Sequence, residues 1–192
     1  MTTQPRTPYT VRDPKVMRAM AHPARMAILQ HLGEGAETTA TECAEICGLS
    51  PSATSYHLRA LAKIGLVEEA PSRGDGRERV WRSPVRGFML DLDDPDVPDA
   101  VPAALALVDV VLQRDEAVLR RWLEKAHEIA QDDSDAVILH RSQIVVTPAE
   151  LEELRAEILK MFEPYTPTQR QEPPAGARKV ITLFRAFPAD PP

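Results

Sequence analysis

Apolar and polar residues alternate with the period of an α-helix over residues 50–65. One side of this segment is apolar and consists of Thr54, Leu58, Leu61 and Ile64, which recur at three- and four-residue steps. Ser50 followed by Pro51 is typical of a helix start, because proline at the first helical position loses no hydrogen bond. Gly65 follows the last turn, where a left-handed residue commonly ends a helix. The pattern predicts an amphipathic helix over residues 50–64.

The other side of this helix is polar, with short hydrogen-bonding side chains near its start and positive charge further along. That order suits a helix that lies in the major groove of DNA. An ordinary amphipathic surface helix has the same pattern, so the neighbouring segments decide between the two interpretations. The candidate DNA-binding residues of this helix are Ser50, Ser52, Thr54, Ser55, Tyr56, His57, Arg59 and Lys63.

Three shorter helices are predicted before it, over residues 14–21, 23–33 and 39–47. The first two each begin with a proline that follows a polar residue. In the third, Thr39 with Glu42 three residues later forms a capping box. A short helix, a tight turn and a second helix together predict a helix-turn-helix.

The period changes after residue 65. Residues 66–69 suit a short strand, residues 73–76 a hairpin turn with an Asp-Gly pair, and residues 78–82 the return strand. A hairpin directly behind a helix-turn-helix is a wing, and its long cations suit phosphates or a narrow minor groove. Charged, solvated hairpin tips are also common without any ligand. The candidate DNA-binding residues of the wing are Arg73, Arg77, Arg79 and Arg82.

Several short motifs occur in a consistent order and resemble the ArsR-type winged-helix family of bacterial repressors. They are Ala21-His22-Pro23-Ala24-Arg25-Met26-Ala27-Ile28-Leu29, Gly48-Leu49-Ser50, Ser55-Tyr56-His57-Leu58-Arg59-Ala60-Leu61 and Gly65-Leu66-Val67. The resemblance covers about residues 12–87. It implies a homodimer that binds a palindromic operator and often leaves it when an effector binds. It also implies that residues 50–64 form the recognition helix and residues 66–83 the wing.

A long helix is predicted over residues 99–131, after an acidic, proline-containing linker at residues 88–98. Its apolar positions approach a heptad pattern, which favours a subunit interface, although the same positions can pack on the chain's own domain. In the family, dimers pair through the first helix and the helix after the wing. The expected dimer-interface residues are Val16, Met20, Val101, Leu105, Val108, Leu112, Leu119 and Trp122.

Residues 132–192 are expected to form a small β-α-β extension. Residues 137–139, 144–146 and 179–187 are strand-like, and Thr147 with Glu150 caps a helix that ends by Pro164. With a flexible tail over residues 1–10 and a DNA-binding domain over residues 11–87, the expected fold class is α+β and mainly α.

Charge is unevenly distributed along the 192 residues, whose net charge is −6. Residues 1–87 carry a net +3 and residues 88–192 a net −9. A basic half joined to an acidic half is expected when one part meets a polyanion. No run of eighteen apolar residues exists, the first ten residues have no signal-peptide core, and two cysteines make no disulfide framework. We therefore expect a cytoplasmic protein without a membrane partner.

Cys43 and Cys47 lie one helical turn apart and invite comparison with a metal or thiol-sensor site. There is no third cysteine, and in the family these positions usually hold apolar core residues. Buried cysteine behaves as a small hydrophobe, so we expect core cysteines and no metal or cofactor. His57 has no arranged nucleophile or acid beside it, and no enzyme motif is present.

The sequence therefore predicts a transcriptional regulator, a repressor rather than an enzyme, that binds double-stranded DNA as a homodimer. One alternative is a regulator gated by a small-molecule effector, with a pocket between the long helix and the C-terminal extension. The other is a protein-interaction module that has lost DNA binding.

Overall fold

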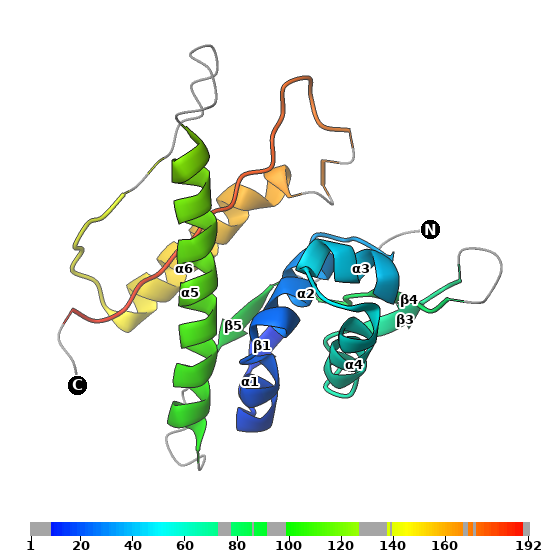
Figure 1. Cartoon of the computed structure of the whole chain (residues 1–192). Coiled ribbons are helices and arrows are strands. Elements are labelled where there is room, and N and C mark those ends of the chain that lie inside the picture. The colour runs from blue at the N-terminus through cyan, green and yellow to red at the C-terminus, as the bar shows by residue number, and fades with distance from the viewer. Residues whose placement is uncertain are drawn as a thin grey trace. The chain divides into compact units, whose positions relative to one another are not determined.

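The chain is described here from a computed structural model that covers residues 9–72, 78–85, 87–91, 99–126, 138, 140–166, 169–170 and 172–189 (Figure 1). It divides into two compact units, Met1–Arg141 and Ser142–Pro192. The fold is mixed α+β and mainly helical, as predicted.

Four short helices form the first part of the first unit, and each begins where the sequence predicts. They are α1 (Pro14–Met20), α2 (Pro23–Gly33), α3 (Ala40–Cys47) and α4 (Pro51–Ala62). The side chains of the four capping residues Asp13, His22, Thr39 and Ser50 each accept a hydrogen bond from a backbone N–H of the first turn. The predicted capping box of α3 is formed in both directions.

The turn between α3 and α4 is a Schellman motif, in which backbone N–H groups bond back to carbonyls of the last helical turn. Gly48 has a positive φ of 65°, and its N–H donates to the Glu45 carbonyl. The Leu49 N–H donates to the Ala44 carbonyl at 2.9 Å. Ser50 then caps α4, so only three residues separate the two helices.

A three-stranded antiparallel sheet combines the two strands of the predicted wing, which follow α4, with a short strand that precedes α3. Its strand order is β2 (Thr38–Thr39), β4 (Val80–Arg82) and β3 (Glu68–Ala70). Glu69 pairs with Trp81 in the register of the hairpin. The hairpin tip, residues 73–77, lies outside the described residues, so the structure does not place Arg73 and Arg77. The helix-turn-helix and the two strands behind it make a winged helix.

Two further strands pair in parallel and were not predicted. They are β1 (Tyr9–Val11) and β5 (Phe88–Leu90). The prediction of a flexible tail over residues 1–10 is therefore wrong for residues 9 and 10. The prediction of a linker over residues 88–98 is wrong for residues 88–90. Residues 1–8 and 92–98 lie outside the described part. Three-residue strands are too short to show a period, and their pairing joins segments far apart in the sequence.

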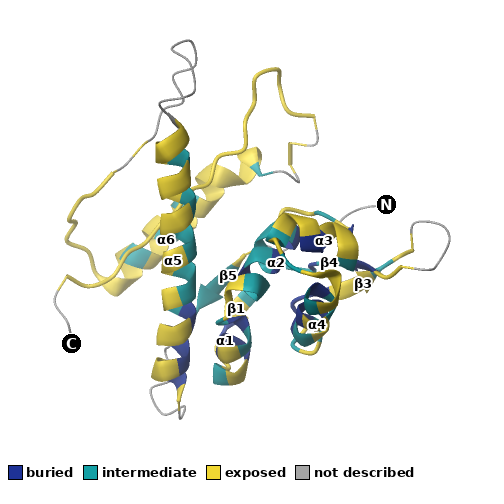
Figure 2. Cartoon of the chain, in the orientation of Figure 1, coloured by how far each residue is buried: buried dark blue, intermediate teal, exposed yellow. Residues whose placement is uncertain are grey.

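One hydrophobic core joins the helices to the wing (Figure 2). Val16 and Met20 of α1 are 8% and 1% exposed and pack within this core. Their assignment to the dimer interface is therefore corrected: the chain's own core already covers them. The largest fully buried side chains are Met17, Met20, Ile28, Leu32, Leu58, Leu61, Leu66 and Leu107.

The helix α5 (Ala100–Ala126) has two apolar sides. Ala103, Ala104 and Leu107 are buried and pack on the core of the same chain. The other side is exposed and carries Val101, Leu105, Leu112, Leu119 and Leu123. Val108 and Trp122 are half-buried. Residues 127–131 of the predicted helix lie outside the described residues. One set of apolar residues on α5 therefore packs on the chain's own core, and a different set forms an exposed row on the outside of the helix.

The second unit contains the helix α6 (Pro148–Phe162) and a short 3-10 helix at Glu163–Tyr165. The capping box of Thr147 and Glu150 is present as predicted. Residues 144–146 and 179–187 form no strands, so the predicted β-α-β arrangement is wrong for the described residues. No described residue of this unit is buried. Without a partner strand or a buried face, an apolar alternating segment gains little from becoming a strand.

Candidate nucleic-acid interface

The helix α4 has one buried face and one open face. Leu58 and Leu61 are fully buried in the core. On the open face, Ser50, Ser52, Tyr56, Arg59 and Lys63 are exposed and Ser55 is half-buried. Tyr56 is 59% exposed, and the edge contact of its ring with His57, at 5.4 Å between centroids, covers part of it. The predicted polar face is therefore available to a ligand over the whole helix.

Two of the candidate DNA-binding residues of this helix are buried. Thr54 is fully buried, and its hydroxyl donates to the Ser50 carbonyl at 3.0 Å. His57 is 9% exposed and lies against the first turn of α2. Both face inward because they follow the stripe of Leu58 and Leu61 around the helix. We therefore remove Thr54 and His57 from the candidate DNA contacts.

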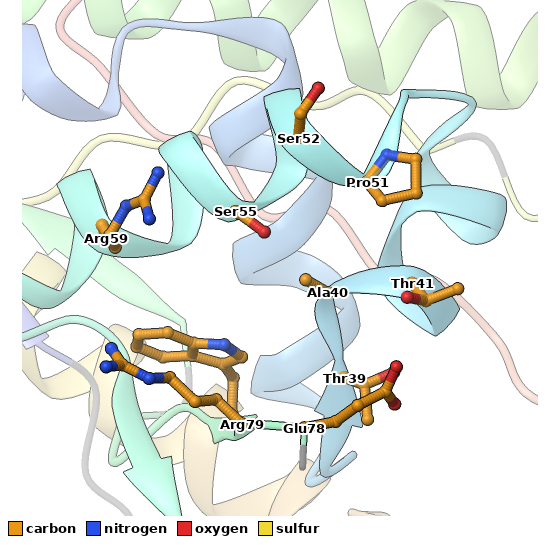
Figure 3. A pocket seen from close by; sticks show the side chains of 10 residues that line it. Thr39, Ala40, Thr41, Pro51, Ser52, Ser55, Arg59, Glu78 and Arg79 are labelled. Atoms are coloured by element: carbon orange, nitrogen blue, oxygen red, sulfur yellow. The ribbon is translucent and has the colours of Figure 1, made fainter.

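A hollow of about 400 Å³ opens beside α4, between the helix pair and the wing. In Figure 3, Ser52, Ser55 and Arg59 line one side of it, and Glu78 and Arg79 line the opposite side. The remaining lining residues are Thr39, Ala40, Thr41, Pro51 and Trp81. The hollow thus brings together three regions that are separate in the sequence: the predicted recognition helix, the wing and the start of α3.

The start of α3 belongs to the site although the sequence did not indicate it. Thr39 caps this helix and Thr41 lies exposed in its first turn, at the edge of the hollow (Figure 3). The helix dipole gives a helix start a partial positive charge that favours a phosphate group, although the Glu42 carboxylate of the capping box offsets part of this charge in α3. The capping box was visible in the sequence, but only the fold shows that it adjoins Ser52 and Arg59.

The two described wing arginines pair with carboxylates. Two of these belong to strand β3 of the hairpin, and the third belongs to the residue just before β2. Arg79 Nη1 lies 3.0 Å from Glu69 Oε1. Arg82 Nε donates to Glu68 Oε1 at 2.8 Å, and its Nη1 lies 3.9 Å from Glu37 Oε1. Arg79 is 68% exposed, whereas Arg82 is 38% exposed. Exposed ion pairs contribute little to stability, so either guanidinium can exchange its carboxylate for a phosphate at small cost.

A buried polar cluster lies beneath α4. The rings of His22 and His57 have centroids 4.6 Å apart. Arg25 Nη1 donates to the Ala19 carbonyl at 2.7 Å, while Arg25 Nε and His57 Nδ1 are buried without a hydrogen-bond partner. Burial lowers the pKa of His57, and the charges of His22 and Arg25 lower it further. The neutral imidazole is therefore the form that suits the packed interface between α2 and α4.

Among the described residues, no three histidine, cysteine or carboxylate side chains gather closely enough to hold a metal ion. No helix in this part of the chain is long and apolar enough to cross a membrane.

Residues 20–70 match the helix-turn-helix domain family, and this range spans α2, α3, the turn and α4. The chain contains a helix-turn-helix domain. Its relatives are transcriptional regulators. The HTH-type transcriptional regulator YgaV of Escherichia coli is 43% identical over 53 residues, which cover 28% of this chain and 54% of the relative.

A second relative extends the match beyond the helix pair. The probable mercury resistance operon repressor of Streptomyces lividans is 33% identical over 93 residues, which cover 48% of this chain and 64% of the relative. The chain thus spans between about half and two thirds of the regulators that it matches.

Among solved structures, the chain is similar to the homodimeric winged helix-turn-helix DNA-binding domain Mb0332 of Mycobacterium bovis, a possible ArsR-family regulator. The identity is 22%, the coverage 55% of this chain and 82% of that one, and the TM-score 0.33.

Proposed function

We propose that this protein is a DNA-binding transcriptional repressor of the ArsR type, which acts as a homodimer on a palindromic operator. The observation that carries the proposal is the hollow between α4 and the wing, where Ser52, Ser55, Arg59, Arg79 and the start of α3 converge. Cationic groups, hydroxyls and a helix start are the groups that proteins use to contact DNA phosphates and base edges.

In this proposal α4 enters the major groove. Ser52, Ser55 and Tyr56 lie in its first half, which is the part that contacts base edges in helix-turn-helix proteins. Arg59 and Lys63 lie one and two turns further on and meet the phosphate backbone. Arg79 and Arg82 of the wing contact the neighbouring phosphates, and the affinity is therefore salt-dependent.

The homodimer of this proposal forms through the exposed seam of α5, defined as Val101, Leu105, Leu112, Leu119 and Leu123. Every one of these side chains is at least 37% exposed in the single chain. Monomeric proteins rarely expose such a long contiguous apolar row, and its near-heptad spacing suits an identical helix. Two copies related by a two-fold axis present two recognition helices to two half-sites, which explains a palindromic operator.

Gel-shift titration of the full chain against the DNA upstream of its own coding sequence, at two salt concentrations, tests the proposal. We expect a discrete complex that weakens strongly between about 50 and 200 mM salt. Random DNA of equal length should bind about a thousandfold or more weakly.

Two charge deletions provide the matched comparison in this experiment. Arg59→Ala removes a cation from the hollow, whereas Lys160→Ala removes an exposed cation from α6, where it pairs with Glu157. We expect Arg59→Ala to lower the affinity and Lys160→Ala to leave it unchanged. Equal weak binding of upstream and random DNA would refute an operator-specific regulator and favour a protein-interaction module.

A further inference from the structure

The two cysteines of the chain lie together at the end of α3. Cys43 is fully buried, Cys47 is half-buried, and both are free thiols. Their sulfur atoms are 3.9 Å apart, within the range of a thiol hydrogen bond. The sequence predicts both as core residues. A role in the core alone explains neither the contact between the two thiols nor the partial exposure of Cys47.

The surroundings make the two thiols unequal. A hydrogen bond from Cys43 and the positive charge of Arg114 lower the pKa of Cys47 to about 7, against the opposing effect of burial. The same hydrogen bond, together with burial, raises the pKa of Cys43. Arg114 belongs to α5 and is held by a hydrogen bond from its Nε to Gln30 Oε1 of α2, at 2.8 Å. Near neutral pH, Cys47 is therefore a thiolate in a large fraction of molecules, while Cys43 keeps its proton.

We propose that Cys43 and Cys47 form a redox pair that a peroxide converts into a reversible intrahelical disulfide, and that this disulfide weakens DNA binding by distorting the turn before α4. The effect on DNA rests on the proposed function above. The half-buried Cys47 supplies the attacking sulfur, and the buried thiol of Cys43 beside it is the resolving group.

The chemistry proceeds in two steps. The Cys47 thiolate attacks one oxygen of hydrogen peroxide, the O–O bond breaks, and the leaving hydroxide takes up a proton to become water. The product is a sulfenic acid on Cys47. The Cys43 sulfur then attacks the Cys47 sulfur, and the departing hydroxide takes the Cys43 proton as a second water. One peroxide is thereby reduced to two waters, and two thiols are oxidised to one disulfide.

A disulfide does not fit the helix as it stands. Side chains four residues apart on a helix have Cβ atoms about 5–6 Å apart. A disulfide requires a separation of about 3.5–4.5 Å. Closing the bond must therefore pull the last turn of α3 out of shape. A strained disulfide of this kind is also easily reduced again, as a reversible switch requires.

The distortion would fall on the connection to the recognition helix. Cys47 is the last residue of α3, and the Schellman bonds of Gly48 and Leu49 follow directly. Ser50, the cap of α4, is three residues from Cys47. Movement of this turn changes the angle between α3 and α4, and with it the shape of the hollow that Ser52 and Thr41 line.

The test treats the reduced full chain with hydrogen peroxide and follows three independent readouts. Intact mass and thiol titration should show the loss of two hydrogens and both thiols, without a cross-linked dimer on a non-reducing gel. Hydrogen exchange should accelerate at the amides of Gly48 and Leu49. Affinity for the upstream DNA should fall about tenfold and recover with dithiothreitol.

Four variants separate the parts of the proposal. Cys47→Ser should bind DNA as the reduced wild type does and ignore peroxide. Cys43→Ala removes both the resolving thiol and the hydrogen bond that lowers the pKa of Cys47, so oxidation should be slower and should stop at a sulfenic acid on Cys47 that dimedone captures, with little change in DNA affinity. Arg114→Gln should raise the pH midpoint of Cys47 alkylation by iodoacetamide, whereas Arg114→Lys should not. If Arg114 only held the structure together, the two variants would not differ in this midpoint.

Three results would overturn the inference: no intramolecular disulfide, a disulfide with unchanged hydrogen exchange at the turn, or a disulfide with unchanged DNA affinity. If the reduced protein binds no DNA at all, the proposed function fails. In that case the mass and exchange measurements still decide whether the redox pair exists and whether it distorts the turn.

Discussion

The imidazole rings of His22 and His57 lie 4.6 Å apart between their centroids, and they join the cap of α2 to the middle of α4. His22 Nδ1 accepts a hydrogen bond from the Ala24 N–H at the start of α2, whereas His57 Nδ1 is buried and unpartnered. The helix α4 therefore rests on a contact that favours the neutral form of His57, because burial and the charges of His22 and Arg25 lower its pKa.

This contact predicts a loss of stability in mild acid. Because the pKa of His57 is lowered in the folded chain, the unfolded chain binds more protons below its ordinary pKa of about 6.5. Stability should be fully present above that pH and decline as the pH falls through the lower folded value. Urea unfolding of the wild type and His57→Gln at about pH 7.5 and 5.5 measures this. The acid-induced loss should be smaller in the variant, and identical losses would contradict the prediction.

The turn between α3 and α4 depends on the left-handed conformation of Gly48, whose φ is 65°. An added Cβ meets no atom within 4 Å there, so the cost of Gly48→Ala is conformational and about 1–2 kcal/mol. Gly33→Ala is the matched control, because Gly33 lies in α2 with ordinary space around its Cβ, and it should stabilise by about 0.4–1 kcal/mol. Chemical denaturation measures both. A Gly48→Ala protein as stable as Gly33→Ala would show that the turn does not need the left-handed residue.

The sequence predicts local features of the fold better than contacts between distant segments. The ends of α4 were predictable because Ser50, Pro51 and Gly65 act locally, through caps and backbone conformation. The parallel pairing of Tyr9–Val11 with Phe88–Leu90 was not, because it depends on a contact between distant segments.

The site shows the same division between local and long-range information. The helical period identifies the exposed face of Ser52, Tyr56 and Arg59, since that face is simply opposite the apolar stripe. It places Thr54 correctly in that stripe, but it does not show that His57, at the border of the stripe, is buried against His22 at the start of α2. The contribution of Thr41 and the charge of Arg114 beside Cys47 both require the tertiary fold.

Two leucines of α5, one in the core and one in the exposed seam, should respond differently to substitution. Leu107 is fully buried in the chain's own core, and Leu107→Ala should destabilise by about 2–5 kcal/mol at any protein concentration. Leu105 is 59% exposed, so Leu105→Glu should leave the fold intact but abolish the dimer. Analytical ultracentrifugation at micromolar concentration, with circular dichroism as the check on folding, distinguishes the two. If the wild type is a monomer, or if Leu105→Glu dimerises as the wild type does, the seam is not the dimer interface.

The hollow predicts a division of labour between α4 and the wing that binding measurements can resolve. Arg79 lies at the wing side of the hollow and is 68% exposed, and in the proposed complex its guanidinium contacts phosphates rather than bases. Arg79→Ala should therefore weaken binding to all sequences alike and reduce the slope of log affinity against log salt by about 1 for each phosphate that is no longer neutralised. Ser55 and Tyr56 face outward from the first half of α4, where base edges are contacted.

Replacing Ser55 or Tyr56 by alanine should instead change the preferred base at one or two operator positions, by about 1–3 kcal/mol per position, with the salt slope preserved. Selection from a randomised operator library, followed by titration of the wild-type site and random DNA at two salt concentrations, measures both effects. Equal losses on operator and random DNA for all three variants would mean that α4 contributes only charge and shape. Recognition would then have to come from groove geometry, sensed through the phosphates that the wing and the start of α3 bind around the hollow.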